Sequence, residues 1–153
     1  MTVSLSPITS VAAEIIATAT FAVQTKGTGF IDITQQAAEF IAEAGGKNGA
    51  LLVFTRHTSA SLVIQENADP DVQLDLVTAL DRLAPANAPW VHDAEGSDDM
   101  PAHVKTAITG VSLHVPVIDG SLALGTWQGI YLVEHRTRPH RREIILQFIG
   151  GRR

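Results

Sequence analysis

The stretch VSLHVPVIDGSLALGTWQGIYLVEHRTRPHRREIILQFI, residues 111–149, decides the fold class of this chain. Its apolar and β-branched residues gather in runs that are bounded by glycine, proline or charged residues, a pattern typical of β-strands joined by short turns. We therefore expect strands over residues 111–118, 122–125, 129–136 and 142–149. Strands dominate the C-terminal third of the chain.

Three further strands are expected upstream. Residues 11–24 are rich in β-branched and small apolar residues, and we interpret them as the first strand. Residues 50–55 and 61–65 are apolar runs of strand length, so the segment between them must contain a turn or a bulge. His57, Thr58 and Ser59 lie in this gap.

Three helices are also expected. The first follows Asp32-Ile-Thr-Gln35, which resembles a capping box, and ends at Gly45-Gly46; its apolar stripe is Ala37, Phe40, Ile41 and Ala44. The second begins at Asp69-Pro70 and reaches Pro85, with Val72, Leu76, Leu80 and Leu83 on one face. A short third helix spans residues 101–109 and ends at Gly110.

Helices and strands are mixed without regular βαβ alternation, which favours an α+β fold of largely antiparallel β-sheet layers with two or three covering helices. The 153 residues, 45% of them apolar, suffice for one core. We expect a single domain over residues 11–153, preceded by a flexible N-terminal arm at residues 1–10.

The composition narrows the chemistry. Without cysteine, the chain has neither disulfides nor thiolate metal ligands. A net charge of -5 that arises from scattered acids argues against a nucleic-acid partner and favours a small molecule. No signal-peptide pattern and no membrane-length apolar run is present, so we expect a cytoplasmic protein without a membrane partner.

The first segment that could carry chemistry is residues 56–61, RHTSAS, followed by residues 66–70, ENADP. Its histidine and hydroxyl groups suit phosphate binding or proton transfer. A polar turn whose hydroxyls satisfy backbone groups explains the same pattern. His57 and Glu66 would lie about 30 Å apart on an extended chain, so sharing one site requires a chain reversal or a neighbouring subunit.

The second segment, residues 92–105, holds two imidazoles and several carboxylates around a glycine. Such a loop can fold its donors onto one divalent ion, either Zn²⁺ or Mg²⁺, with His92, His103, Asp98 and Asp99 as candidate ligands. The spacing matches no named zinc motif, and a solvated acidic loop that caps the next helix is an equally good interpretation.

The third segment is the Gly125-Thr-Trp-Gln128 turn. Trp127 offers an aromatic plane beside the Gln128 amide, which suits a flat ligand, although a Trp packed over a hairpin end is more common. His114 lies in an apolar run and is more typical of a core or interface residue. The basic turn at residues 135–142 is typical of a solvated loop, and it could also attract phosphate.

These segments together resemble the YjbQ-like family. The signature is Ser112-x-x-Val-x-Val-x-x-Gly120-x4-Gly125-Thr-Trp-Gln-x-Ile130, accompanied by His57-Thr-Ser-Ala, Glu66-Asn-Ala-Asp-Pro, His92-x-x-Glu95-Gly96 and Ala102-His103-Val-Lys105. The resemblance covers residues 11–150. It implies a compact α+β homotrimer and a secondary thiamine-phosphate synthase activity, with the site near a subunit boundary.

The implied reaction joins a hydroxymethylpyrimidine diphosphate to a thiazole phosphate and releases pyrophosphate. We expect His57, Glu66 and His103 to be catalytic, and the substrate to contact Thr58, Ser59, Asn67, Lys105, Trp127 and Gln128. A divalent metal, helped by Arg56 or Lys105, would neutralise the leaving group. Two alternatives remain open: a metal-dependent hydrolase of a phosphorylated metabolite, and a non-catalytic trimer that binds a small ligand.

Overall fold

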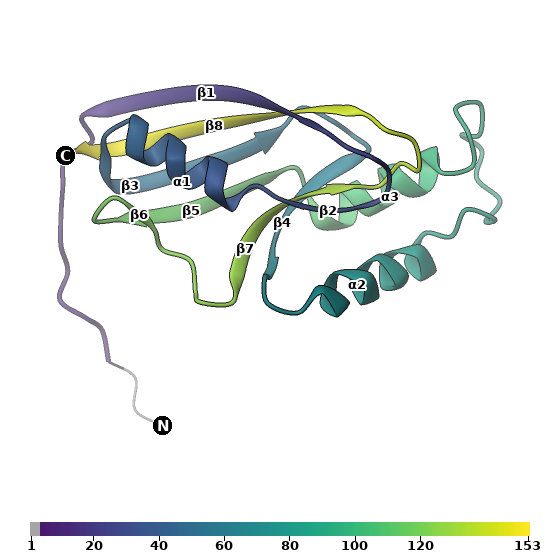
Figure 1. Ribbon diagram of the computed structural model, residues 1–153, viewed down its shortest axis with the longest axis horizontal. Coiled ribbons are helices and arrows are strands. Elements are labelled where there is room, and N and C mark those ends of the chain that lie inside the picture. The colour runs from purple at the N-terminus through teal and green to yellow at the C-terminus, as the bar shows by residue number, and fades with distance from the viewer. Residues whose placement is uncertain (1–3) are drawn as a thin grey trace.

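The computed structural model describes residues 4–153, and it consists of two antiparallel sheets packed face to face (Figure 1). The larger sheet has the order β1-β8-β3-β5-β6, and its strands are β1 (Ile15–Gln24), β8 (Arg141–Arg152), β3 (Gly46–Thr55), β5 (Ser112–Ile118) and β6 (Ser121–Leu122). The smaller sheet has the order β2-β7-β4, with β2 (Gly29–Asp32), β7 (Gln128–Glu134) and β4 (Ala60–Glu66). Every strand pair is antiparallel, which confirms the expected α+β class.

The core lies between the two sheets and includes one face of α1 (Thr34–Glu43). Alternate residues of β8, namely Ile144, Leu146 and Phe148, point into this core because side chains alternate across a strand. Strand β7 is buried from Gly129 to Glu134, since it is the central strand of the smaller sheet and is covered on both faces. The outer face of the larger sheet carries no covering helix among the described residues.

The other two helices lie at the opposite end of the molecule from the C-terminus (Figure 1). Helix α2 (Pro70–Leu83) begins as expected: the Asp69 carboxylate accepts a hydrogen bond from the Asp71 N–H, and Pro70 follows it. Helix α3 (Asp99–Thr109) packs beside β4 and ends at Gly110, which has a φ of 95°. An irregular loop, residues 84–98, joins the two helices.

Several sequence expectations need correction. The first strand begins at Ile15 rather than at residue 11, the 122–125 strand is reduced to β6, and β2 was not expected. Asp32 does not form a capping box, because the N-cap of α1 is Ile33 and Asp32 lies one residue before it. The Asp32 carboxylate accepts a hydrogen bond from the Thr34 N–H. Residues 4–14 form no helix or strand, and all of them are exposed. Residues 1–3 of the expected arm lie outside the described residues.

The basic turn at residues 135–142 is also different from the expected solvated loop, because two of its members, His135 and Arg142, are buried. The Arg142 guanidinium donates to both carboxylate oxygens of Glu134, and both side chains are at least 95% buried. His135 is buried and paired with the Ser61 hydroxyl. This polar network joins the two sheets near the start of β4, since Arg142 also donates to Ser59.

No helix among residues 4–153 is long and apolar enough to cross a membrane.

Candidate functional site

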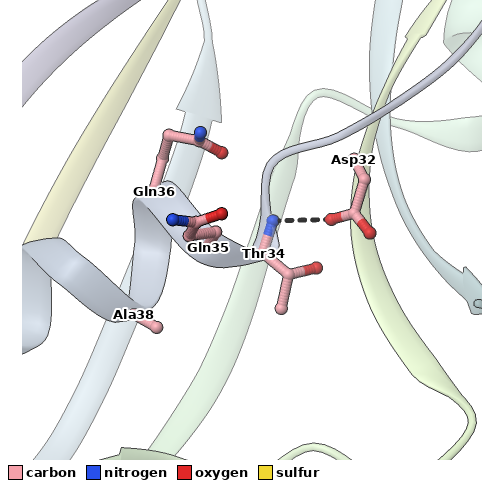
Figure 2. Close-up of a pocket in the computed structure, with 5 residues that line it drawn as sticks. All are labelled: Asp32, Thr34, Gln35, Gln36 and Ala38. Atoms are coloured by element: carbon pink, nitrogen blue, oxygen red, sulfur yellow. Dashed lines mark hydrogen bonds between the residues drawn. The ribbon is translucent and has the colours of Figure 1, made fainter.

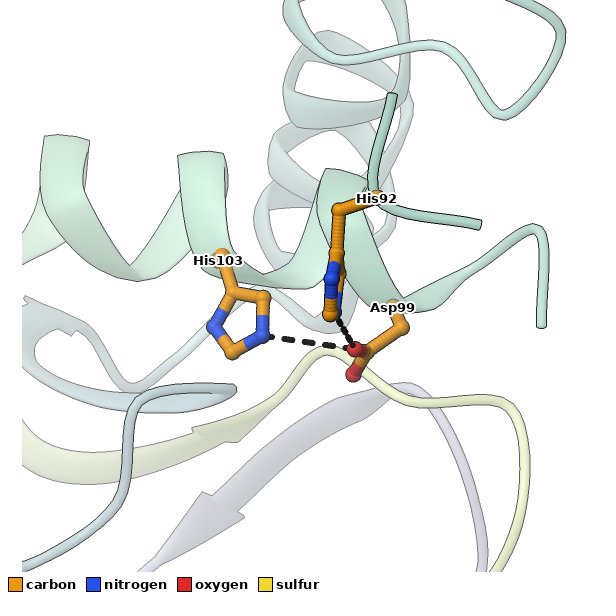
Figure 3. A group of neighbouring side chains, drawn as sticks. All are labelled: His92, Asp99 and His103. Atoms are coloured by element: carbon orange, nitrogen blue, oxygen red, sulfur yellow. Dashed lines mark hydrogen bonds and ion pairs between the residues drawn. The ribbon is translucent and has the colours of Figure 1, made fainter. Parts of the chain in front are cut away.

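Three side chains converge at the N-terminal end of α3 (Figure 3). Asp99 and His103 lie one helical turn apart and therefore share a face of α3, and His92 reaches the same point from the preceding loop. One ligand atom from each of the three residues lies within 4.8 Å of the others. The Asp99 Oδ2 atom is 2.7 Å from His92 Nε2 and 3.3 Å from His103 Nε2.

Asp99 and His103 each make a further contact that orients the side chain. The His103 Nδ1 atom lies 2.8 Å from the Thr58 carbonyl oxygen, an acceptor that fixes the ring proton on Nδ1 and leaves Nε2 with a lone pair. The second oxygen of Asp99 is bound by the Arg136 guanidinium. Metal-ligating histidines and carboxylates in proteins are typically oriented by such outer hydrogen bonds.

The electrostatics of Asp99 follow from these contacts. Burial alone would raise the pKa of Asp99, but the hydrogen bond to His92 and the charge of Arg136 outweigh burial and hold the pKa below its ordinary value. The side chain is only 3% exposed, whereas His92 is 46% and His103 is 32% exposed. The cluster is thus a buried carboxylate with two imidazoles that open toward solvent.

Asp98, the fourth expected metal ligand, lies outside this cluster. Its Oδ2 atom accepts from Arg136 and from both the N–H and the hydroxyl of Thr137. Burial opposes ionisation of Asp98, but the hydrogen bonds from Thr137 and Arg136 prevail and lower its pKa to about 2. Asp98 therefore anchors the loop to residues 136–137 and does not face the imidazoles.

Sequence reasoning missed Arg136. This side chain, 12% exposed, binds Asp98 and Asp99 and also donates to the Glu95 carbonyl oxygen, so it determines where the loop ends and α3 begins. No local pattern marks Arg136 among the other basic residues of its turn, because its partners lie about 40 positions away in the chain.

A pocket of about 440 Å³ adjoins the cluster. It is lined by His57, Thr58, His103, Thr106, Ala107, Gly110 and Val111. His57 Nε2 accepts from the Glu143 N–H at 2.9 Å, so the neutral ring carries its proton on Nδ1. Burial, together with the charge of Arg142, lowers the pKa of His57 and favours this neutral form.

Lys105 lies in a different pocket. It is only two residues from His103, so it points to another face of α3, where its buried ammonium pairs with Asp81 of α2. Lys105 and His135 line this second pocket, also of about 440 Å³, between α2 and α3. The structure therefore separates Lys105 from the His92, Asp99 and His103 cluster.

Three residues next to His57 have partners within the fold. The Ser59 side chain is buried and its hydroxyl accepts from Arg142, as the polar-turn interpretation expects. Thr58 contributes its backbone carbonyl to His103, and the residue is exposed. Arg56 is exposed and pairs with Glu143.

Glu66, Asn67, Trp127 and Gln128 form a second group at the far end of β4. In the β4–β7 ladder Ala60 lies opposite Glu134, whereas Glu66 lies opposite Gln128, so the two ends are about 20 Å apart. Glu66 accepts from the Asp69 N–H, and Gln128 accepts from the Gly125 N–H at 2.7 Å. Trp127 is 64% exposed. No reversal of the chain brings this group to His57 within one subunit.

A further pocket, of about 500 Å³, lies at the start of α1 (Figure 2). It is lined by Asp32, Thr34, Gln35, Gln36 and Ala38. The Thr34 N–H, which could otherwise receive an anion, already donates to Asp32 at 2.8 Å. Its polar groups are the Asp32 carboxylate, the Thr34 hydroxyl and two side-chain amides, so this pocket contains one titratable side chain and no cluster of them.

The fold and the site together define a two-sheet α+β protein with a two-histidine, one-carboxylate cluster beside a pocket. The family model described as UPF0047 protein YjbQ-like matches residues 19–151, and the chain belongs to this family. A UPF0047 protein of Synechocystis is 46% identical over 84% of this chain and 88% of its own length. YjbQ of Escherichia coli O157:H7 is 41% identical over 86% of this chain and 96% of its own length.

Solved structures agree with this assignment. A YjbQ/UPF0047 family protein from Clostridium acetobutylicum superimposes with a TM-score of 0.81 at 36% identity, covering 86% of this chain and 99% of that one. A protein of unknown function from Sulfolobus solfataricus gives a TM-score of 0.84 at 28% identity, covering 90% and 99%. The family and the α+β fold expected from the sequence are confirmed.

Proposed function

We propose that this protein is a divalent-metal-dependent enzyme that acts on a phosphorylated small molecule. The observation that carries the proposal is the convergence of His92, Asp99 and His103, with the Thr58 carbonyl holding His103 so that Nε2 faces the other two ligand atoms. Two imidazoles and one carboxylate suit Zn²⁺ better than Mg²⁺, which prefers oxygen donors. Both imidazoles are partly exposed, so substrate can reach the ion.

The bound metal would supply positive charge to a phosphate or diphosphate group. The chain's own residues then position the rest: Arg136 holds Asp99, and His57 offers its Nδ1–H as a donor beside the cluster. Lys105 is left out of this arrangement, because it lies on the other face of α3. Arg56 is the exposed cation nearest in sequence to His57, and Glu143 already pairs with it.

Thiamine-phosphate synthesis, which the family resemblance implies, is the finer form of this proposal. A thiazole nitrogen forms a bond to the pyrimidine methylene carbon, the carbon–oxygen bond breaks, and pyrophosphate leaves with the electron pair. Charge neutralisation at the departing diphosphate is what the cluster would provide. A hydrolase of a phosphorylated metabolite would use the same cluster with water as the nucleophile.

Metal binding is the first test. We expect protein purified without an affinity tag to bind one Zn²⁺ per chain, as measured by metal analysis and calorimetric titration. His92→Ala removes an exposed ligand with little effect on packing and should weaken Zn²⁺ binding about a hundredfold or more. His140→Ala, which removes an imidazole outside the cluster, is the matched control. Equal Zn²⁺ affinity in the wild type and His92→Ala would contradict the proposal.

Product analysis then distinguishes the reactions. Metal-loaded protein is incubated with hydroxymethylpyrimidine diphosphate and thiazole phosphate. Thiamine phosphate with pyrophosphate indicates the synthase, phosphate release without thiazole indicates the hydrolase, and saturable binding without turnover indicates a ligand-binding protein. If His57→Ala or His103→Ala, correctly folded, turns over as fast as the wild type, the residue's assigned role is wrong.

We also propose that the protein self-associates, as a homotrimer according to the family resemblance. Support comes from the outer face of the larger sheet. In register across the sheet, Ile16, Ile149, Ala50 and Pro116 form one row. The next two rows of this face are Thr18-Gln147-Leu52-His114 and Thr20-Ile145-Phe54-Ser112, and they contain no aspartate, glutamate, lysine or arginine. An uncharged sheet face of this extent is typical of an interface between subunits.

A further inference from the structure

The pocket beside the metal cluster shares two residues with it. His103 is a proposed ligand, and Thr58 supplies the carbonyl that orients His103. Any molecule in the pocket therefore lies next to the exposed side of the cluster. A volume of about 440 Å³ is within the range of small-molecule sites.

The wall of this pocket is built from small residues where α3 ends. Ala107, Gly110 and Val111 come from the last turn of α3 and the approach to β5, and none of them carries a polar side chain. A wall without long side chains accepts a flat apolar group and offers nothing to a second phosphate. The proposed metal, which would bind the phosphate, lies by contrast on the side of His92 and Asp99.

Two polar groups are available inside this apolar surface. Thr106 is 5% exposed, and its hydroxyl is the one buried side-chain polar atom without a hydrogen-bond partner in the described part of the chain. Buried polar groups in native proteins are normally paired, so the Thr106 hydroxyl is the group at this pocket that still needs a partner. His57 adds a second donor through Nδ1, since Nε2 is occupied by the Glu143 N–H.

We propose that this pocket is the subsite for the organic part of the substrate: a compact flat ring with a hydrogen-bond acceptor on its edge, attached to the phosphate that binds the metal. The ring lies against Ala107 and Val111, and its acceptor receives hydrogen bonds from Thr106 or His57. This inference rests on the proposed function and adds to it the place where the ring of the substrate binds.

Binding of matched phosphate monoesters tests the subsite. Benzyl phosphate and methyl phosphate carry the same charged group and differ in the ring. In Zn²⁺-loaded wild type we expect benzyl phosphate to bind about tenfold more tightly, because the ring buries apolar area. Pyridylmethyl phosphate, whose ring nitrogen is an acceptor, should bind more tightly still, and Thr106→Val should remove that additional gain.

Ala107→Phe fills the pocket from an exposed position of α3 without changing a proposed metal ligand. It should reduce benzyl phosphate affinity to that of methyl phosphate and leave methyl phosphate and Zn²⁺ affinities unchanged. Ile108→Phe adds the same ring one residue along the helix, at a position that is 55% exposed and outside the pocket, and should behave as the wild type.

The two proposals fail in different ways. If the protein binds no Zn²⁺, the proposed function is wrong. The subsite is then tested in metal-free protein by NMR titration with benzyl alcohol, which must shift the resonances of Val111 in the wild type but not in Ala107→Phe. If Zn²⁺ binds normally and the two phosphates have equal affinity, or if Ala107→Phe has no effect, the subsite is wrong.

Discussion

His135 and His92 illustrate how the fold assigns different tasks to the same side chain. His92 extends from an exposed loop toward Asp99, whereas His135 is 3% exposed and paired with the Ser61 hydroxyl. Burial, and after it the charge of Lys105, lowers the pKa of His135 to about 4. His135 is therefore a neutral structural residue at pH 7.

The lowered pKa of His135 makes stability depend on pH. Between about pH 6.5 and pH 4 the unfolded chain binds a proton at His135 and the folded chain does not, so this contribution is complete above pH 6.5 and is lost as pH falls to 4. We expect its size to be about 3 kcal/mol. Urea unfolding of the wild type and His135→Gln at pH 7.5 and pH 4.5 measures it. The glutamine variant should lose less stability on acidification, and an identical loss in both proteins would refute the assignment.

The Glu134–Arg142 pair leads to a second prediction at this scale. Arg142→Met leaves the fully buried Glu134 carboxylate without its counter-charge, and losing one partner of a buried pair costs about 3–5 kcal/mol. Arg141→Met, at an exposed neighbouring position, should change the free energy of unfolding far less. Chemical denaturation of both variants checks the comparison, and comparable losses would show that burial of the pair is unimportant.

At the scale of elements, the pairing of β3 with β8 depends on glycine. Gly49 lies opposite Gly150, and a Cβ atom on Gly49 would come within 2.7 Å of the Gly150 Cα and closer still to the Ile149 carbonyl oxygen. Neither backbone can withdraw without breaking the ladder. The two strands can therefore pair at this point only because both positions lack side chains.

Gly49→Ala should accordingly destabilise the fold by about 2 kcal/mol or more, as overpacking against a rigid neighbour does. Gly151→Ala is the control, because its added Cβ would make only ordinary contact, 3.4 Å from the Ala12 carbonyl oxygen. Thermal and urea unfolding of the two variants should differ clearly. If both alanine variants are equally stable, the close approach of β3 and β8 does not constrain the sequence.

Helix α3 shows how one element serves two sites. Asp99, His103 and Thr106 face the cluster and its pocket, while Pro101 and Lys105 face the pocket beside α2. The 3.6-residue period of the helix separates the two sets, although His103 and Lys105 are almost adjacent in the chain. The family resemblance placed Lys105 at the substrate, whereas the helical period turns it toward the pocket beside α2.

At the scale of the whole molecule, the rows around Ile149 on the outer face of the larger sheet, which lack Asp, Glu, Lys and Arg, have the largest consequence. Within the single chain the Glu66 end and the His57 end of β4 are about 20 Å apart, so a site that contains both ends needs a second subunit. The expectation of a shared site between subunits is thus retained as part of the self-association proposal.

Ile149→Lys tests that face. This residue is 44% exposed in the single chain, so a lysine there is tolerated by the subunit but would place a charge in the middle of an apolar row. We expect light scattering to give three times the 16.3 kDa chain mass for the wild type and a single-chain mass for the variant. Leu74→Lys, on α2 and 65% exposed, should leave the wild-type mass unchanged. A monomeric wild type would refute the proposal.

Much of the secondary structure follows from local patterns. The Asp69-Pro70 start of α2, the end of α3 at Gly110 and the long strands β3, β5 and β8 were each indicated by residues within a few positions of the boundary. Strand β2 escaped notice because four residues are too few to establish a period, and it exists only through pairing with β7. The irregular loop over residues 84–98 was expected, and its path was not.

By itself, the sequence determined the α+β class, most element boundaries and the grouping of His92, Asp99 and His103 into one segment, because these depend on periodicity, turn residues and short spacing. The family was recognised from the resemblance of its motifs. Only the tertiary structure decided that Asp98 pairs with Arg136 and that Lys105 lines the pocket beside α2. It also decided that Glu66 and Trp127 lie about 20 Å from the His57 end of β4. The physical reason is that hydrogen bonds and ion pairs between residues tens of positions apart form only when the sheets and helices pack, and no local pattern encodes them.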